Sequence, residues 1–182
     1  MRTEEFEHVV AAAAEATGHD VLVVIGSQAI LASHDDPPEA MLESMEADLY
    51  PLHDPDAADL VDGALGDGSP FHVAHGYYAH GVGPETAKPP HGWEERLVKV
   101  EIEPRLGSRR KKPAIALCLE KHDLVLSKCV AGRERDWEYA SAALTAGIVQ
   151  ADVLLERVPD LPVPEELREH VASMLRAIIA RG

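Results

Sequence analysis

Two acidic residues, Glu46 and Asp48, stand two positions apart in the stretch MEADLYP. A strand that carries them places both carboxylates on one face, with their Cα atoms about 6.5 to 7 Å apart. Two negative charges this close repel each other unless a cation lies between them. Because Mg²⁺ prefers carboxylate and phosphate oxygens, the pair predicts a divalent metal site beside a phosphate group, the alternative being two solvated side chains on a half-exposed strand.

A Gly-Ser pair, Gly26 and Ser27, follows the apolar run VLVVI and precedes a short segment that can form a helix. Backbone N–H groups at the start of a helix attract anions, and glycine lets a phosphate approach the backbone closely. By itself such a pair is most often a tight turn. Its combination with the acidic pair on the next predicted strand favours a nucleotide-binding site.

Lys128 is the only charged residue within LVLSKCVA, a strongly apolar stretch of predicted helix. Burying an ammonium group without a partner is costly, so Lys128 is expected to meet a carboxylate or a ligand phosphate. Asp136 follows eight residues later, just past the helix break at Gly132. The two residues are candidates for the catalytic site, and a structural Lys–Asp bridge or a lysine that reaches water along the helix edge are the alternatives.

A third acidic ligand is sought on the alternating segment RLVKVEIE, residues 96–103. Its apolar residues face one side of a strand, and Lys99, Glu101 and Glu103 face the other. If this strand lies beside that of Glu46 and Asp48, Glu101 becomes the third metal ligand. A solvated strand face is the alternative.

Two further clusters are less specific. Three histidines, His72, His75 and His80, lie in a connection rich in glycine and proline, but their spacing is not that of a common zinc site, so a histidine-rich loop is expected. Residues 105–112 reverse the sign of the local charge, and they are expected to form an exposed, solvated loop, with a phosphate-contacting loop as the alternative. The basic residues of this loop are Arg105, Arg109, Arg110, Lys111 and Lys112.

The elements that must position these residues follow from hydrophobic patterning and helix signals. Helices are predicted over 4–16, 27–33, 55–65, 121–132, 135–146, 151–157 and 164–180, and strands over 21–25, 45–51, 96–103 and 114–119. Residues 66–92 are expected to hold short strands in a long irregular connection. The predicted fold class is α/β (α+β), with a small mixed β-sheet core over residues 1–119 and a C-terminal helical bundle, residues 120–182, packed on it as a single compact unit.

The composition of the chain limits the classes of partner that it is expected to bind. A net charge of −15 argues against a broad nucleic-acid-binding surface, because phosphate binding needs clustered Lys and Arg. The apolar surroundings of Cys118 and Cys129 favour reduced, buried thiols. The longest apolar runs fall short of the roughly 20 residues that span a bilayer, and the N-terminus is acidic, so we expect a cytoplasmic protein with no membrane partner.

The order strand, Gly-Ser, short helix and acidic-x-acidic strand resembles the active-site signature of the DNA polymerase β-like nucleotidyltransferase superfamily. The later motifs LEKHDLVLSK and RERD are similar to the helical motif of the AbiEii and MenT toxin group and its uncharacterised bacterial relatives. These motifs span residues 21–145. Two features depart from the pattern: Glu46 stands where aspartate is usual, and the 18 residues between Ser27 and Glu46 exceed the typical spacing.

The resemblance implies an enzyme that uses Mg²⁺ or Mn²⁺ to move a nucleoside monophosphate from a nucleoside triphosphate (NTP) to an acceptor. It implies that the acceptor is the 3′ end of a tRNA and that the protein is a toxin with a partner antitoxin. A protein-AMPylating antitoxin and a catalytically silent nucleotide-binding or interaction module are the alternatives. The implied roles are phosphate binding by Gly26 and Ser27, metal binding by Glu46 and Asp48, and a catalytic requirement for Lys128 and Asp136.

Overall fold

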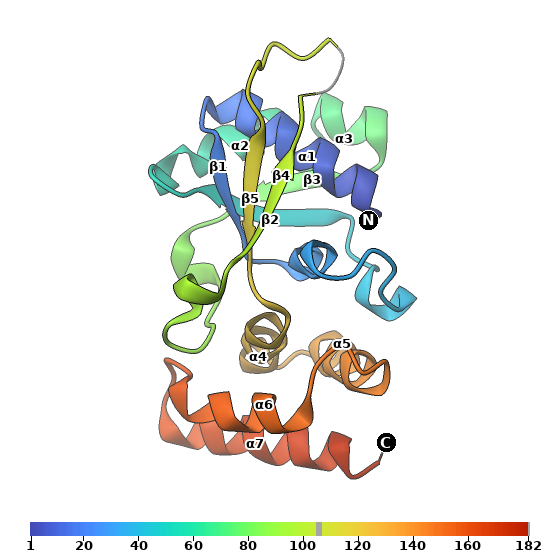
Figure 1. Cartoon of the computed structure of the whole chain (residues 1–182), viewed down its shortest axis with the longest axis vertical. Helices are drawn as coiled ribbons and strands as arrows, with labels where there is room; N and C mark the ends of the chain where they lie inside the picture. Colours follow the sequence, from blue (N-terminus) through green and yellow to red (C-terminus); the bar gives the residue numbers. More distant parts are fainter. Residues whose placement is uncertain (105–106, 182) are drawn as a thin grey trace.

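The computed structural model describes residues 1–104 and 107–181 of the chain. Within these ranges five strands form one sheet in the order β3-β2-β1-β5-β4 (Figure 1). The strands are β1 (Val21–Val24), β2 (Glu46–Pro51), β3 (Tyr78–Gly81), β4 (Val98–Ile102) and β5 (Ala114–Cys118). The α-helices are α1 (Thr3–Thr17), α2 (Ala58–Leu65), α3 (Pro70–His75), α4 (Lys121–Ala131), α5 (Glu134–Thr145), α6 (Ala151–Arg157) and α7 (Glu165–Ile179).

The sheet is mixed, which confirms the predicted fold class. Strand β1 pairs antiparallel with β2 and parallel with β5. At the two edges, β3 runs parallel to β2, and β4 runs antiparallel to β5. Because β1 and β5 run in the same direction, the segments that leave them both begin at the same end of the sheet. These segments are the 3₁₀ helix η1 (Ser27–Ala32) and helix α4.

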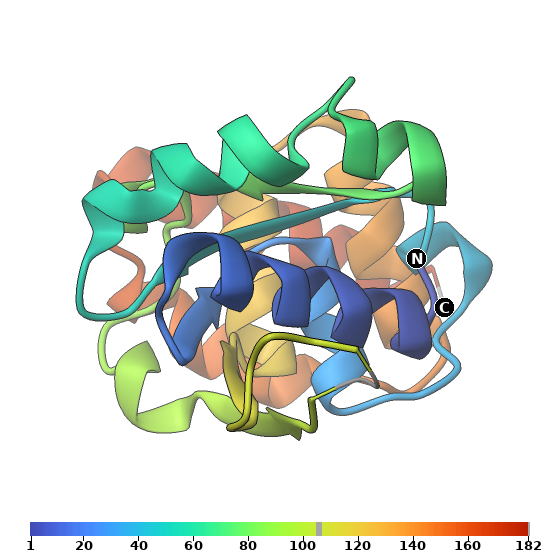
Figure 2. The ribbon, with the colours of Figure 1, turned by 90° about the horizontal axis from the view of Figure 1, so that it is seen from above.

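Helices α1 and α2 pack against each other and against the sheet, and Figure 2 shows them side by side (dark blue and teal). Helix α1 presents one apolar stripe to the sheet and ends at Gly18, whose φ of 74° is the left-handed conformation that favours glycine. The buried residues of this stripe are Phe6, Val9, Val10, Ala13 and Ala14. Their spacing of three and four residues gives α1 a continuous contact with the core.

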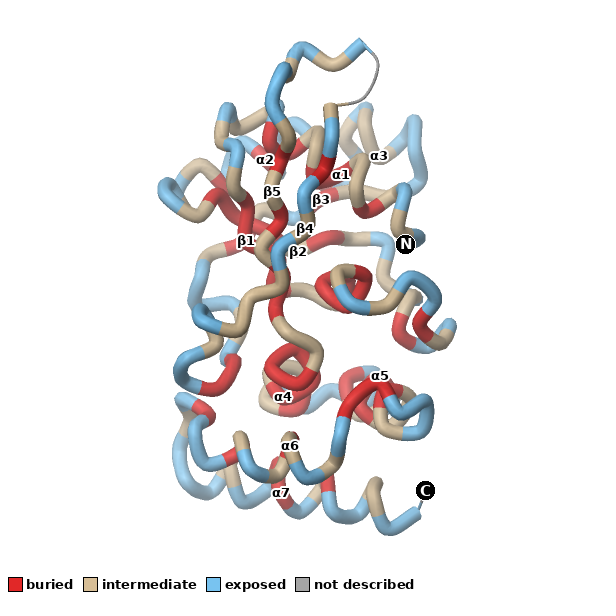
Figure 3. Tube along the Cα trace, in the orientation of Figure 1, coloured by how far each residue is buried: buried red, intermediate tan, exposed pale blue. Residues whose placement is uncertain are grey.

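Helices α4 to α7 form the predicted helical region at the end of the sheet where β1 and β5 finish (Figure 1). Figure 3 shows buried positions gathered in the sheet and in α4, with most of the outer surface of α6 and α7 exposed. Helix α7 buries Val171 and Leu175 and exposes its opposite side. Among the described residues, no helix has both the length and the hydropathy needed to cross a bilayer.

A buried ionic network joins the sheet region to the helices. The fully buried carboxylate of Asp123 on α4 accepts hydrogen bonds from Nε of Arg96, at 2.7 Å, and from Nη1 of Arg157 on α6, at 2.8 Å. Arg157 also donates to Glu120, at 2.7 Å. Burial alone would raise the pKa of Glu120, but hydrogen bonds from His122 and Arg157 lower it to about 2. The network therefore holds α4 and α6 in a fixed position beside Arg96.

Candidate functional site

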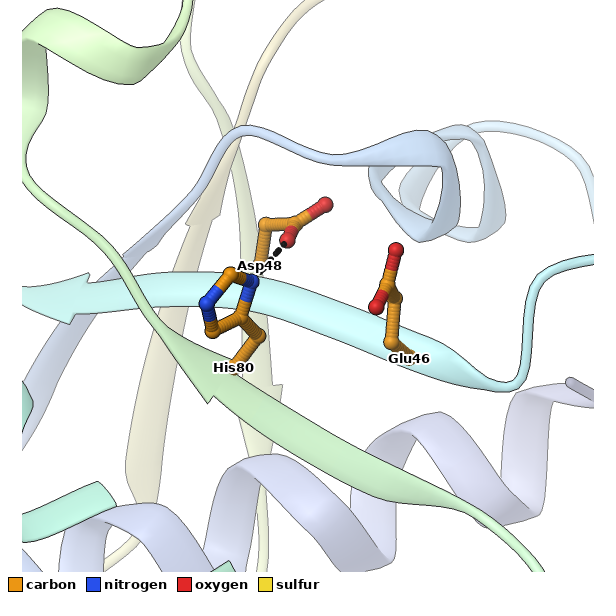
Figure 4. A group of neighbouring side chains, drawn as sticks. All are labelled: Glu46, Asp48 and His80. Atoms are coloured by element: carbon orange, nitrogen blue, oxygen red, sulfur yellow. Dashed lines mark hydrogen bonds and ion pairs between the residues drawn. The ribbon is translucent and has the colours of Figure 1, made fainter. Parts of the chain in front are cut away.

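Strand β2 brings Glu46 and Asp48 together. The strand alternation places both carboxylates on the same face, and Figure 4 shows them projecting to the same side of β2. Asp48 is 23% exposed at its side chain, so its carboxylate is largely shielded from water. The structure thus forms the acidic pair that the sequence spacing predicts.

Gly26 lies directly against Asp48. Strand β1 is the antiparallel neighbour of β2, and the Ile25 N–H donates to the Asp48 carbonyl oxygen at 3.0 Å, which brings the turn after β1 to the acidic pair. A Cβ atom on Gly26 would lie 2.8 Å from both Cβ and Cγ of Asp48, a distance that real Cβ atoms do not show. The glycine is therefore required by a close approach between backbone and side chain, and the predicted positions Gly26, Ser27 and Asp48 fall in one place.

Strand β3 adds two polar side chains that sequence reasoning did not assign to the site. In the parallel register of β2 and β3, Glu46 pairs with Tyr78 and Asp48 pairs with His80. The Tyr78 hydroxyl donates to Oε2 of Glu46 at 2.9 Å, and Nδ1 of His80 lies 3.2 Å from Oδ1 of Asp48. The segment YAH has the same two-residue spacing as EAD, and this repeated alternation is the signal that could have identified it.

The electrostatics of this face favour a bound cation. Burial and, to a smaller extent, the charge of Glu46 raise the pKa of Asp48 above its ordinary value. Burial and the hydrogen bond to Glu46 raise the pKa of Tyr78 to about 12, so its hydroxyl stays protonated and donates. One oxygen each from Glu46 and Asp48 and one ring nitrogen of His80 lie within 4.8 Å of one another, as a set of metal ligands would. The acidic pair, the close approach of Gly26 and the raised pKa of Asp48 together fit a divalent metal ion.

Lys128 and Asp136 form the predicted contact. Nζ of Lys128 lies 3.6 Å from Oδ1 of Asp136, which is fully buried, and 4.6 Å from the ring centroid of Tyr139. Burial lowers the pKa of Lys128, and the charge of Asp136 opposes that shift. Burial alone would raise the pKa of Asp136, but the hydrogen bonds and charge of Arg133 and the charge of Lys128 lower it. Asp136 therefore lies behind Lys128 and holds its ammonium group in place.

A pocket of about 460 Å³ unites these groups. Its walls include Gly26, Ser27, Glu46, Asp48, His80, Ser127, Lys128, Arg133, Arg135 and Tyr139. This volume lies within the range of about 300 to 1,000 Å³ that small-molecule sites occupy. The acidic pair lies on the sheet and the basic residues lie on α4 and α5, so the pocket offers opposite charges from its two sides. The Tyr139 hydroxyl donates to the Ser27 carbonyl oxygen at 3.2 Å and joins the two sides.

The expected position of Glu101 is wrong. Its strand, β4, lies at the opposite edge of the sheet from β3, separated from β2 by β1 and β5. The Glu101 side chain is 54% exposed and pairs with Lys99 at 3.2 Å. The sheet order thus removes Glu101 from the acidic pair, and the described residue nearest to a third ligand is His80.

The described part of the basic loop, residues 107–112, also lies away from the pocket. It precedes β5, whereas Gly26 follows β1, and because these strands are parallel the two segments lie at opposite ends of the sheet (Figure 1). Arg110 pairs with Asp20, and Nε of Arg109 lies 3.9 Å from Glu15; Arg105 lies outside the described residues. Arg109, Lys111 and Lys112 are exposed, as expected of a solvated loop, whereas the Arg110 side chain is only 11% exposed and is held against α1 and Asp20.

The three histidines do not form one cluster. His80 is beside Asp48, whereas Nδ1 of His72 lies 3.0 Å from Asp67 and the ring of His75 packs on that of His8 with centroids 4.7 Å apart. His80 alone among the three reaches the pocket. The expected histidine-rich loop is wrong, because His72 and His75 lie in helix α3 and His80 lies in strand β3.

Comparison with known proteins agrees with this geometry. Residues 4–170 match the family described as "nucleotidyltransferase of unknown function (DUF6036)". Neither the curated proteins nor the solved structures gave a match. The matched range contains the whole pocket and the sheet that positions it, and the family description agrees with the resemblance at the level of the superfamily. The chain belongs to this nucleotidyltransferase family.

Proposed function

We propose that the protein is a Mg²⁺-dependent enzyme that transfers a nucleoside monophosphate from an NTP to an acceptor hydroxyl. One observation carries the proposal: Glu46 and Asp48 line the same pocket as Lys128, and Gly26 and Ser27 form part of its wall. Carboxylates on one side suit a divalent metal, and an ammonium group on the other suits a phosphate. A nucleoside triphosphate with its metal presents this pair of charges.

The metal ligands in this proposal are Glu46 and Asp48. Bound Mg²⁺ or Mn²⁺ would neutralise charge on the triphosphate and polarise the α-phosphate. Tyr78 holds Glu46 by the hydrogen bond at 2.9 Å, which limits the rotamers of the longer glutamate side chain. Position 46 thus carries glutamate in place of the usual aspartate, and the Tyr78 hydroxyl fixes the longer glutamate side chain.

The remaining groups bind and orient the triphosphate. Gly26 and Ser27 would accommodate the β- and γ-phosphates against the backbone. Lys128 would balance the negative charge that develops as the acceptor oxygen bonds to the α-phosphorus and the bond to pyrophosphate breaks. Asp136 and Tyr139 act as positioning residues, since both contact Lys128 from the protein side.

The acceptor we propose to test first is the 3′ end of a tRNA, with the protein as the toxin of a toxin–antitoxin pair. The similarity of LEKHDLVLSK and RERD to the AbiEii and MenT motifs supports this choice. A protein hydroxyl is the second candidate. The net charge of −15 favours it, as does the distance of the basic loop from the pocket, because an RNA backbone needs clustered positive charge beside the site.

The test is label transfer from each of four α-³²P-labelled nucleoside triphosphates, with Mg²⁺, in the presence and absence of total tRNA and of a cell extract. Asp48→Asn removes one proposed ligand, and Glu101→Gln is the matched control, because Glu101 is a strand carboxylate at the far edge of the sheet. We expect label in RNA or protein with the wild type and with Glu101→Gln, and none with Asp48→Asn. Nucleotide binding without transfer to either acceptor would instead identify a catalytically silent binding module.

A further inference from the structure

The imidazole of His80 lies beside the acidic pair formed by Glu46 and Asp48. His80 comes from β3, the strand next to that of Glu46 and Asp48, and Figure 4 shows its ring turned toward Asp48. Nδ1 of His80 is 3.2 Å from Oδ1 of Asp48, and the three potential ligand atoms lie within 4.8 Å of one another. A metal ion that contacts both carboxylates would therefore have a ring nitrogen within reach.

The position of His80 is fixed by the sheet. Its register places it opposite Asp48, and a strand side chain cannot change faces without a one-residue slip of the whole strand. Such a slip is opposed by Tyr78, which is bonded to Glu46, and by Gly81, whose N–H donates to Asp62 at 2.9 Å. The His80 side chain is 52% exposed, so its ring has room to turn from Asp48 toward a shared ion.

This donor set differs from one made of oxygen alone. Mg²⁺ takes oxygen ligands almost exclusively, whereas imidazole is a good ligand for the first-row transition metals. We propose that His80 is a third protein ligand at this site and makes it prefer Mn²⁺, or a later first-row dication, over Mg²⁺. The inference rests on the proposed function, because it names the metal class for the same pocket.

A different role for His80 is an ion pair. A protonated imidazole beside Asp48 would itself neutralise the carboxylate and compete with a metal ion. The two roles predict opposite effects of removing the ring: a lost ligand weakens binding of Mn²⁺, whereas a lost competitor strengthens it.

The experiment measures the bound metal directly. The wild-type chain, His80→Asp, His80→Gln and the control His19→Ala are titrated with Mn²⁺ and with Mg²⁺ in the presence of pyrophosphate, which contains no nitrogen. Free Mn²⁺ is followed by electron paramagnetic resonance, with Mg²⁺ as the competitor. Pulsed measurement of ¹⁴N coupling to bound Mn²⁺ then reports a ring nitrogen. His19 precedes β1 and pairs with Asp54 at 3.4 Å, at the end of the sheet away from the pocket, so its loss should leave the metal unaffected.

We expect ¹⁴N coupling in the wild type and in His19→Ala and none in the two His80 variants. The ratio of Mn²⁺ to Mg²⁺ affinity should fall about 10-fold or more in His80→Asp, since removal of a ligand or its supporting partner costs about 10- to 100-fold in metal affinity and the new carboxylate favours Mg²⁺. The inference would be overturned by ¹⁴N coupling that persists in the His80 variants, or by a ratio of Mn²⁺ to Mg²⁺ affinity that is unchanged in His80→Asp. Tighter Mn²⁺ binding in His80→Gln would overturn it as well. If label transfer persists under those results, only the role of His80 fails; absence of both metal binding and transfer in the wild type would reject the proposed function as well.

Discussion

Gly26 and Asp48 are in contact across the first two strands, with room between them for a hydrogen atom and none for a methyl group. A Cβ at position 26 would lie 2.8 Å from Cβ and Cγ of Asp48, so the clash involves the base of the side chain as well as its end. The position of the Asp48 carboxylate therefore depends on the absence of a side chain at position 26.

Gly26→Ala should displace Asp48 and lower transfer activity by about 100-fold or more, with a loss of about 1 to 3 kcal/mol in the free energy of unfolding from overpacking. The control is Gly63→Ala on α2, where an added Cβ meets nothing within 4 Å. Helix propensity predicts that this control gains up to about 1 kcal/mol. Activity of Gly26→Ala equal to that of the control would show that Asp48 does not need this position.

Asp48→Asn should abolish transfer and at the same time stabilise the metal-free protein. Burial and the charge of Glu46 raise the pKa of Asp48, which means that keeping it ionised at pH 7 costs folding free energy. A neutral amide of the same shape removes that cost, and we expect a gain on the order of 1 kcal/mol by thermal unfolding without divalent metal. Adding Mn²⁺ should raise the melting temperature of the wild type and leave the variant unchanged; a variant that melts lower without metal would contradict this account.

Replacing Lys128 should mainly lower the transfer rate, whereas replacing Asp136 should mainly lower the free energy of unfolding. Lys128→Met keeps the length and removes the charge, leaving Asp136 paired with Arg133 at 2.7 Å, so the fold should persist while the transfer rate falls about 100- to 1,000-fold. Asp136→Asn leaves the buried ammonium group of Lys128 without its carboxylate, and about 3 kcal/mol of stability should be lost. Denaturant unfolding and single-turnover transfer measure the two effects separately. Equal loss of stability in both variants would argue that the pair is structural.

Glu120 should give the protein a defined acid sensitivity. Its pKa falls from 4.5 in the unfolded chain to about 2 in the folded protein, so the stabilisation is complete above pH 4.5 and is lost as the pH falls toward 2. Glu120→Gln should cost about 2 to 3 kcal/mol at neutral pH, and the difference from the wild type should shrink across this acid range. Urea unfolding at a series of pH values measures it. A constant difference down to pH 2 would assign the effect to packing.

We propose that residues 1–119 and 120–182 unfold as one cooperative unit, because Asp123 binds Arg96 and Arg157 from the two sides of the boundary. The chain has two tryptophans, Trp93 before the boundary and Trp137 after it. Trp93→Phe and Trp137→Phe each leave one fluorescent reporter, and the two urea transitions should coincide. In an Asp123→Asn background both midpoints should fall together, whereas a shift of one alone would show two separable units.

Local patterns in the sequence determined most of the helices and strands and several residues of the pocket. The alternation of Glu46 and Asp48 and the apolar surroundings of Lys128 can both be interpreted from neighbouring residues, since strand and helix periods fix which side chains share a face. For the same reason, the helices after Glu120 begin and end close to the residues at which their punctuation predicts them. The contact between Lys128 and Asp136 also follows locally, because a short turn at Gly132 returns the chain onto α4.

The order of the strands was decided only by the tertiary structure. Whether Glu101 or His80 stands beside the acidic pair depends on which edge of the sheet β4 and β3 occupy. Alternation within a strand shows which of its side chains share a face, but it does not show which strand lies next to it. The same is true of the close approach between Gly26 and Asp48 and of the hydroxyl of Tyr139 at Ser27. These contacts join segments distant in the chain, and they form because packing the whole core selects one arrangement among many that local patterns allow.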